Sequence, residues 1–342
     1  MKVLVIGGTR FLGRFIVEEA LKQGHEVTLF NRGNNKELFP QLETIIGDRT
    51  EDLSLLETGK WDAAIDTCGF TPRAVDEMTK MLADKIDHYT YISSISVYKD
   101  WAVNNIDESY DVQTLTDEQV NEIGYGTSEQ INEHYGALKA ICEQTAEQNL
   151  PNKTFHIRAG LLVGPHDYTD RFTYWVERIS KGGKVFVPGR KDRPIQWIDA
   201  RDLASWIVKK VDEKVTGVYN VTGPDETLTM ESFLKACIEV TNSSCQLIWA
   251  NEQFVTQKEI APWSQLPLWI PESSPLPGQK EPWLGTFTIN INKALHLGLT
   301  YRPIEETVRD TFQWDSTREN RKKTAGLTVQ LEKELLEEYL NE

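Results

Sequence analysis

Residues 2–13 carry the pattern that most constrains the fold: a short apolar run, a glycine turn and the start of a helix. Residues 3–6 are all apolar, as in a strand buried on both faces of a parallel sheet. Apolar residues then recur at helical spacing from Phe11 to Leu21, and Gly24 is a typical C-terminal stop. Residues 25–30 have the composition of a second strand. The sequence therefore predicts a β-α-β unit at the start of the chain.

The glycines of this unit suit the diphosphate of a dinucleotide. Gly7 permits a tight bend, Gly13 permits close packing of helix on strand, and the helix N-terminus offers unpaired N–H groups. Arg10 stands where this motif usually has its middle glycine. A glycine turn with a purely structural role is the alternative. The residues expected to line the cofactor in this turn are Gly7, Thr9, Arg10, Phe11, Leu12 and Gly13.

The end of the second predicted strand bears on the choice of dinucleotide. NAD sites usually place Asp or Glu there, whereas NADP sites lack the acid and supply a cation. This chain has Asn31 followed by Arg32. Guanidinium–phosphate pairing would let Arg32, and Arg10 from the first turn, hold a 2′-phosphate. We therefore favour NADP over NAD, with two solvated surface arginines as the alternative.

Strand and helix patterns alternate through the first half of the chain. Further strands are expected at residues 44–46, 61–67, 89–93, 154–163 and 217–221, with a helix at 74–83. This alternation predicts an α/β fold with a doubly wound parallel Rossmann sheet of about seven strands. Ligands of such sheets bind beyond the carboxyl ends of the strands. We therefore expect cofactor contacts from Asp48, Arg49, Cys68 and Gly69, although Asp48 can equally be an ordinary loop acid.

Composition narrows the classes of partner. The net charge of −15 over 342 residues disfavours nucleic acid and anionic membranes. No segment approaches the roughly 18 apolar residues that span a bilayer. The four cysteines show no spacing typical of a disulfide framework or a zinc site. We expect a cytoplasmic protein with a small-molecule substrate and no metal, and we leave a homodimer open.

Later in the chain, three polar residues suggest a type of reaction. Ser94 follows the fifth predicted strand, and Tyr135 and Lys139 share one helix face at i, i+4 spacing. A nearby ammonium is expected to lower the pKa of a tyrosine, which can then exchange a proton with an alcohol or carbonyl. A serine hydroxyl can steady charge on the same oxygen. Two solvated helix residues are the alternative for Tyr135 and Lys139.

In this order, the motifs resemble those of the extended short-chain dehydrogenase/reductases, the NAD-dependent epimerase/dehydratase family. The resemblance covers residues 1 to about 225 and includes segments 158–165, 196–202 and 217–223. It implies a seven-stranded Rossmann sheet with a small C-terminal substrate domain. It also implies that Ser94, Tyr135 and Lys139 are the catalytic triad, with Tyr135 as acid/base and Lys139 holding the nicotinamide ribose.

Three departures make this an atypical member. Arg10 replaces the middle glycine. Ile95 and Ser96 stand where the sugar dehydratases of the family carry an Asp-Glu pair, which disfavours water elimination. Leu161 stands where many nucleotide-sugar enzymes have an asparagine that contacts the substrate diphosphate.

The expected organisation has three parts. Residues 1–165 plus 195–223 form the NAD(P)-binding domain, and residues 166–194 plus 224–315 form the substrate-binding domain. Residues 316–342 are a charged helical tail. Tryptophans after residue 224 line a ligand pocket or, as we favour, form the core of a loop-rich domain. The acidic segment 107–122 is either a lid or a solvated insertion.

The sequence therefore predicts an NAD(P)-dependent epimerase or reductase that transfers hydride at a secondary alcohol or carbonyl, of a sugar or sugar nucleotide. The alternative is a non-catalytic member of the same fold, either a dinucleotide sensor or an RNA-associated protein.

Overall fold

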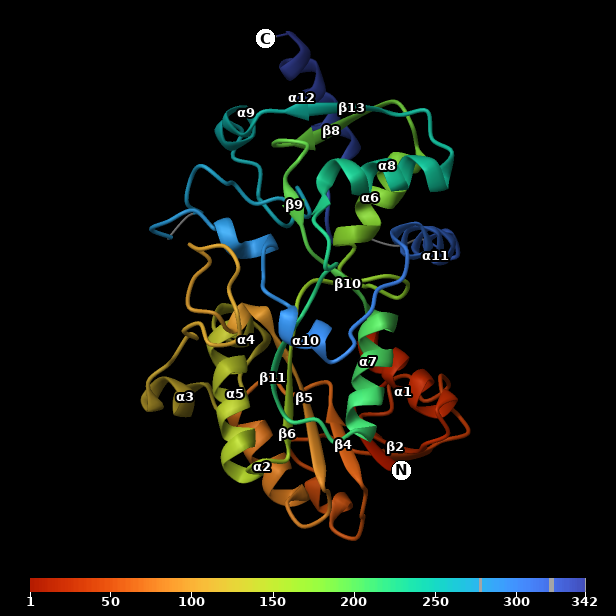
Figure 1. Ribbon diagram of the computed structural model, residues 1–342, viewed down its shortest axis with the longest axis vertical. Coiled ribbons are helices and arrows are strands. Elements are labelled where there is room, and N and C mark those ends of the chain that lie inside the picture. Colours follow the sequence, from red (N-terminus) through yellow and green to blue (C-terminus); the bar gives the residue numbers. More distant parts are fainter. Residues whose placement is uncertain (277–278, 320–322, 342) are drawn as a thin grey trace.

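The computed structural model describes residues 1–276, 279–319 and 323–341. Within these residues the largest sheet has seven strands, in the order β11-β6-β5-β4-β1-β2-β3 (Figure 1). Every neighbouring pair is parallel. The predicted Rossmann-type α/β fold is therefore confirmed. The strands are β1 (Lys2–Ile6), β2 (Glu26–Asn31), β3 (Glu43–Ile46), β4 (Ala63–Asp66), β5 (His88–Ser94), β6 (Thr154–Ala159) and β11 (Gly217–Val221).

Helices cover both faces of the sheet because its strands are apolar on both sides. On β1, Val3 and Val5 face one core cluster, and Leu4 and Ile6 face another. The first cluster includes α1 (Leu12–Lys22) and α7 (Ala200–Asp212). The second includes α2 (Pro72–Leu82) and α5 (Tyr135–Asn149). The continuous apolar runs seen in the sequence thus reflect burial on both faces.

A second body lies beyond the carboxyl ends of the strands, in the upper half of Figure 1, and has its own core. Within it, β8 and β13 form a parallel pair, and α12 packs on β8. Its longer elements are α6 (Arg171–Ser180), β8 (Lys184–Pro188), α8 (Met230–Thr241), β13 (Gln246–Ala250), α11 (Ile304–Ser316) and α12 (Val329–Asn341). The tail helix therefore joins this body through Leu331, Leu335, Leu336 and Tyr339.

Short elements complete the described chain. The helices are α3 (Asp117–Ile123), α4 (Ser128–Glu133), α9 (Glu252–Gln257) and α10 (Asn292–His296). The strands are β7 (Leu162–Val163), β9 (Pro194–Ile195), β10 (Ile198–Asp199) and β12 (Leu228–Thr229). Three 3₁₀ turns span Leu53–Leu56, Ile95–Val97 and Leu284–Phe287. No helix among the described residues is both long and apolar enough to cross a membrane.

The predicted sixth strand, 154–163, is wrong as a single element. The chain turns at Gly160, where an added Cβ would lie 2.3 Å from the Thr222 hydroxyl oxygen. It then resumes as β7, which pairs with β10 instead of continuing in the main sheet. This break sends the following loop toward the glycine turn.

The acidic segment is neither a free lid nor wholly solvated. The backbone just before it is fixed to the C-terminal half, by hydrogen bonds from Asn105 N–H to Thr288 O and from Asn290 N–H to Ile106 O. The side chain of Glu108 accepts a hydrogen bond from the backbone of Asn220 on β11. Only the later part, around α3, is mostly exposed.

Candidate active site

The glycine turn between β1 and α1 has the tight geometry that the sequence predicts. Gly7 has φ +96°, and a Cβ there would lie 2.4 Å from the Thr67 hydroxyl oxygen. A Cβ on Gly13 would lie 3.0 Å from the Cα of Gly8, so Gly13 packs against the turn itself. Thr67, which the motif did not reveal, supports the turn: its hydroxyl accepts from Gly8 N–H at 3.4 Å and donates to Ile6 O at 2.8 Å.

Arg10 does not lie with Arg32 in this structure. Its guanidinium stacks over the ring of Tyr168, 4.1 Å from the ring centroid. The next residue, Phe11, has the positive φ of +39° that favours glycine. Its ring contacts the Tyr168 ring edge to face. Thr9 is half-buried, and Leu12 is buried as the first residue of α1. Arg10 and Phe11 therefore join the glycine turn to the loop of residues 166–170.

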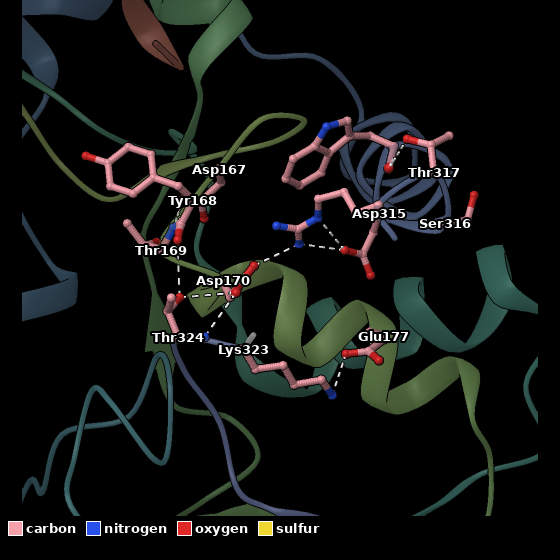
Figure 2. Close-up of polar contacts among 12 residues, drawn as sticks. Asp167, Tyr168, Thr169, Asp170, Glu177, Asp315, Ser316, Thr317, Lys323 and Thr324 are labelled. Carbon is pink, nitrogen blue, oxygen red and sulfur yellow. Dashed lines mark hydrogen bonds and ion pairs between the residues drawn. The ribbon is translucent and has the colours of Figure 1, made fainter. Parts of the chain in front are cut away.

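The C-terminal segment anchors that loop from behind, as Figure 2 shows. Arg318 donates to Asp170 at 2.8 Å and to Asp315 at 2.6 Å. The backbone N–H of Thr324 donates to the same Asp170 carboxylate, and its hydroxyl donates to Tyr168 O at 3.2 Å. The loop over the glycine turn is thus held by residues about 150 positions later in the chain.

At the end of β2, the Asn31 side chain has a structural role and the Arg32 side chain is exposed. The Asn31 amide donates to Gly7 O at 3.0 Å and accepts from Gly33 N–H at 2.9 Å, so it links β2 to the glycine turn. Among the described residues the exposed Arg32 guanidinium makes no hydrogen bond or ion pair, and its charge helps to lower the pKa of Asp48. Asp48 accepts from the Thr50 backbone and hydroxyl, and these hydrogen bonds lower its pKa.

Arg49 is placed differently from the sequence prediction. Its guanidinium pairs with the buried carboxylate of Asp66, at 2.8 and 2.9 Å. Cys68 and Gly69 do lie at the carboxyl end of β4, and the thiol of Cys68 is 3.6 Å from the Arg49 guanidinium. Arg49 therefore supports the turn that follows β4.

Ser94 and Tyr135 are brought together as predicted. Ser94 is the last residue of β5 and Tyr135 the first of α5. The Ser94 oxygen accepts from Ser96 N–H at 3.1 Å, which fixes its direction. Burial raises the pKa of Tyr135, and a hydrogen bond with Ser94 partly offsets that effect. The phenol is therefore neutral near pH 7 in this arrangement.

Lys139 lies one turn further along α5 and is 3% exposed. Its ammonium donates to Gly69 O at 2.8 Å and to Ile92 O at 2.6 Å, and it lies 6.0 Å from the Tyr135 ring centroid. Burial lowers the pKa of Lys139 to about 8. The expected lowering of the tyrosine pKa by this ammonium is therefore absent here, because burial of the phenol dominates.

A buried polar network behind Ser94 escaped sequence reasoning. Arg158 on β6 pairs with Glu143 on α5 at 2.8 Å, and both are about 5% exposed. Glu143 also accepts from the Ser93 hydroxyl at 2.5 Å. Arg158 donates to the Tyr98 hydroxyl, which donates to Asn220 at 2.6 Å. The network ties β5, β6, α5 and β11 together beside the triad.

Two ionisable residues after β7 add charge near the same edge. Asp167 has no exposed surface. Among the described residues its Oδ1 accepts a hydrogen bond from the Thr169 N–H at 2.8 Å, and its Oδ2 has no hydrogen-bond partner. Arg171 begins α6 and lies over the Trp263 ring, 5.1 Å from its centroid. Within the described residues its guanidinium makes no hydrogen bond or ion pair.

The tryptophans after residue 224 are mostly core residues, as we favoured from the sequence. Trp269 is buried in a core cluster, and Trp249 and Trp283 pack on core clusters. Trp263 contacts Arg171 at this edge.

We predict that Asp167→Asn stabilises the protein at neutral pH. Burial raises the pKa of Asp167 to about 6, so the folded state disfavours its charged form. The unfolded chain ionises this carboxyl near pH 4, so the destabilisation grows between pH 4 and 6 and is constant above. Two pKa units correspond to about 3 kcal/mol as an upper value. Urea unfolding from pH 4 to 8 should show a gain that rises to pH 6; a gain independent of pH would contradict this.

The model of the "NAD dependent epimerase/dehydratase family" matches residues 3–75. A UDP-glucuronic acid 4-epimerase from Bacillus cereus, solved in complex with NAD, superposes with a TM-score of 0.63 at 15% identity, covering 92% of this chain and 96% of that chain. The UDP-Glc/GlcNAc 4-epimerase from Campylobacter jejuni gives a TM-score of 0.65 at 14% identity, covering 93% and 99%.

A curated relative is the "Chloroplast stem-loop binding protein of 41 kDa b" from Arabidopsis thaliana. It is 27% identical over 255 residues, which are 69% of this chain. The aligned part spans 62% of the relative's own length. The family model matches the N-terminal part of the chain, and the solved epimerases share its fold, so both findings agree with the resemblance drawn from the motifs.

Proposed function

We propose that this chain is a nicotinamide-dependent epimerase or reductase that acts at a secondary alcohol or carbonyl of a sugar or sugar nucleotide. The observation that carries the proposal is the meeting of Ser94, Tyr135 and Lys139 at the carboxyl edge of the sheet, beside the glycine turn. The solved enzymes that share the fold are named as UDP-sugar 4-epimerases. That likeness supports the substrate class.

The glycine turn suits a dinucleotide because a backbone without side chains can approach a diphosphate closely. Gly7, Gly8 and Gly13 leave little or no room for a Cβ, since the turn packs tightly on Thr67, on the core and on itself. The N-terminus of α1 follows this turn and would offer unpaired N–H groups to the diphosphate. Leu12 and Thr9 complete the turn, and Asp48 and Cys68 lie at the neighbouring strand ends. When bound, the nicotinamide ring would accept hydride from, or return it to, the reacting carbon.

The chain's own residues would move the proton. Tyr135 in its phenolate form would take a proton from the substrate hydroxyl as hydride leaves its carbon, and the neutral phenol would give that proton to the carbonyl in reverse. Ser94, already hydrogen-bonded with Tyr135, would orient the same oxygen. Lys139 would favour the phenolate form of Tyr135, because its ammonium lies on the same helix face as the phenol.

Arg171 offers a means to hold an anionic part of the substrate. The half-buried guanidinium rests on Trp263 and is attracted by the Asp167 carboxylate, but within the described residues it makes no hydrogen bond or ion pair. Leu161 cannot supply the amide that many nucleotide-sugar enzymes use, so a charged contact from α6 would replace it. The mode of binding would then differ from that of the typical members.

The choice between NAD and NADP rests on Arg32 alone, because Arg10 lies on Tyr168. Three solved neighbours are described in complex with NAD. We predict that Arg32→Ala weakens NADPH binding about tenfold, through loss of one charge-assisted contact, and leaves NADH binding unchanged. Arg10→Ala, the matched control, should affect both cofactors equally. Calorimetric titration measures each; tighter binding of NADH than of NADPH by the unmodified protein would contradict an NADP preference.

The cofactor content of the purified protein separates the two reaction types. An epimerase recycles its cofactor and retains it, whereas a reductase must exchange it with solution. Released nucleotide can be measured by absorbance after denaturation. Near-stoichiometric content would favour an epimerase, and protein free of nucleotide that turns over with added NADPH would favour a reductase.

A further inference from the structure

A buried ion pair lies beneath the turn that holds the lysine of the candidate triad. Arg49 follows β3, and Asp66 is the last residue of β4. Both guanidinium nitrogens of Arg49 bond the Asp66 carboxylate, at 2.8 and 2.9 Å, and one also donates to Ala74 O on α2. Asp66 has no exposed surface. Such a pair is costly to break from one side, because the remaining charge stays buried.

The Asp66 carboxylate also fixes the turn that follows it. Its Oδ1 accepts from the backbone N–H of Cys68 at 3.0 Å, and its Oδ2 accepts from the Tyr89 hydroxyl at 2.7 Å. A Cβ on Gly69 would lie 2.8 Å from the Tyr91 ring and 3.0 Å from the Asp66 carboxylate. The turn of residues 68–70 is therefore packed directly on the ion pair.

This turn presents one carbonyl to the active site. Gly69 O accepts from the Lys139 ammonium at 2.8 Å and from the Tyr91 hydroxyl at 2.9 Å. The second acceptor of Lys139, Ile92 O, belongs to β5 and is set by the sheet. Of the two carbonyls that hold Lys139, Gly69 O belongs to a turn and not to the sheet. Its position therefore depends on the contacts that Asp66 makes with this turn.

We infer that Arg49 and Asp66 are positioning residues that aim the Lys139 ammonium through the carbonyl of Gly69. The role of this aim in catalysis rests on the proposed function. The sequence predicts that Arg49 contacts the cofactor. In the structure it pairs with Asp66 instead and so supports the site of Lys139. Because the charges of Arg49 and Asp66 have opposite signs, the ion pair adds little net charge beside Lys139.

Several charged and titratable groups face Lys139. Burial lowers the Lys139 pKa most; the Asp66 carboxylate and nearby thiols raise it, and Arg49 lowers it. The facing groups are Cys142 and Tyr135 on α5, Asp66 and Cys68 at the end of β4, Tyr91 on β5, and Arg49. Removing one member of the ion pair therefore shifts the Lys139 pKa in opposite directions: upward in Arg49→Met, downward in Asp66→Asn.

Nuclear magnetic resonance of ¹³C-labelled lysine tests this without any substrate. The full-length protein, with its Lys139 signal assigned through Lys139→Arg, is titrated from pH 6 to 11. We expect an apparent pKa near 8 in the unmodified protein, a higher one in Arg49→Met and a lower one in Asp66→Asn. Arg178→Met, which breaks the Arg178–Glu332 pair in the C-terminal body, should leave it unchanged. Equal or unidirectional shifts would overturn the inference.

If either ion-pair variant fails to fold, Tyr91→Phe provides the second test. It removes the other donor to Gly69 O and keeps both charges. We expect kcat to fall by roughly tenfold with little change in KM, as for a misplaced catalytic group. Unchanged kcat would overturn the positioning role. Opposite shifts of the Lys139 pKa in a protein that shows no turnover would instead count against the proposed function alone.

Discussion

Replacing Tyr135 with phenylalanine is expected to lower kcat by about 10²- to 10⁴-fold, because the variant lacks the group that exchanges a proton with the substrate. KM and cofactor binding should change little, since the ring and its packing remain. Turnover of UDP-glucose, UDP-N-acetylglucosamine and UDP-glucuronic acid, followed by chromatography of the products, measures the effect.

Tyr125→Phe is the matched control for this substitution. Its hydroxyl donates to Glu77 on α2, away from the triad, so kcat should be unchanged. If Tyr135→Phe and Tyr125→Phe were equally active, Tyr135 would not be the acid/base.

Replacing Arg158 with methionine is expected to cost about 3–5 kcal/mol of unfolding free energy, as for other broken buried ion pairs. The substitution leaves Glu143 charged and buried, with the Ser93 hydroxyl as its remaining partner from this network. It also removes a donor to the Tyr98 hydroxyl. Urea unfolding near pH 7 measures the loss.

The exposed pair Arg190–Glu272 supplies the comparison for Arg158. Arg190→Met breaks an ion pair whose side chains are 49% and 31% exposed, so it should cost less than about 1 kcal/mol. Equal losses in the two variants would mean that the Arg158 network adds nothing beyond a surface ion pair.

The sequence predicts the features that depend on local order. The glycine turn, the strands of the main sheet and the i, i+4 pair of Tyr135 and Lys139 all follow from spacing of two to seven residues. The fold and the meeting of Ser94 with Tyr135 followed from these patterns, because parallel sheets bring their carboxyl ends to one edge.

The rest depends on contacts between distant segments, which no short pattern records. Arg49 has the same appearance in the sequence whether it faces a cofactor or the Asp66 carboxylate 17 residues away. Arg10 is held by Tyr168, and the loop containing Tyr168 is held in turn by Arg318 and Thr324. The raised pKa of Tyr135 likewise follows from burial, which the spacing to Lys139 does not reveal.

The most direct test of a hydride-transfer site is absorbance at 340 nm when cofactor-loaded protein is mixed with substrate. With NAD- or NADP-loaded protein and each of the three UDP-sugars named above, the account predicts that at least one gives a transient rise from reduced nicotinamide. At equal cofactor occupancy, the rise should be about 10²-fold slower or more in Tyr135→Phe. No rise with any of these sugars, or an equal rise in Tyr135→Phe, would contradict the assignment of Ser94, Tyr135 and Lys139 as the site of hydride transfer.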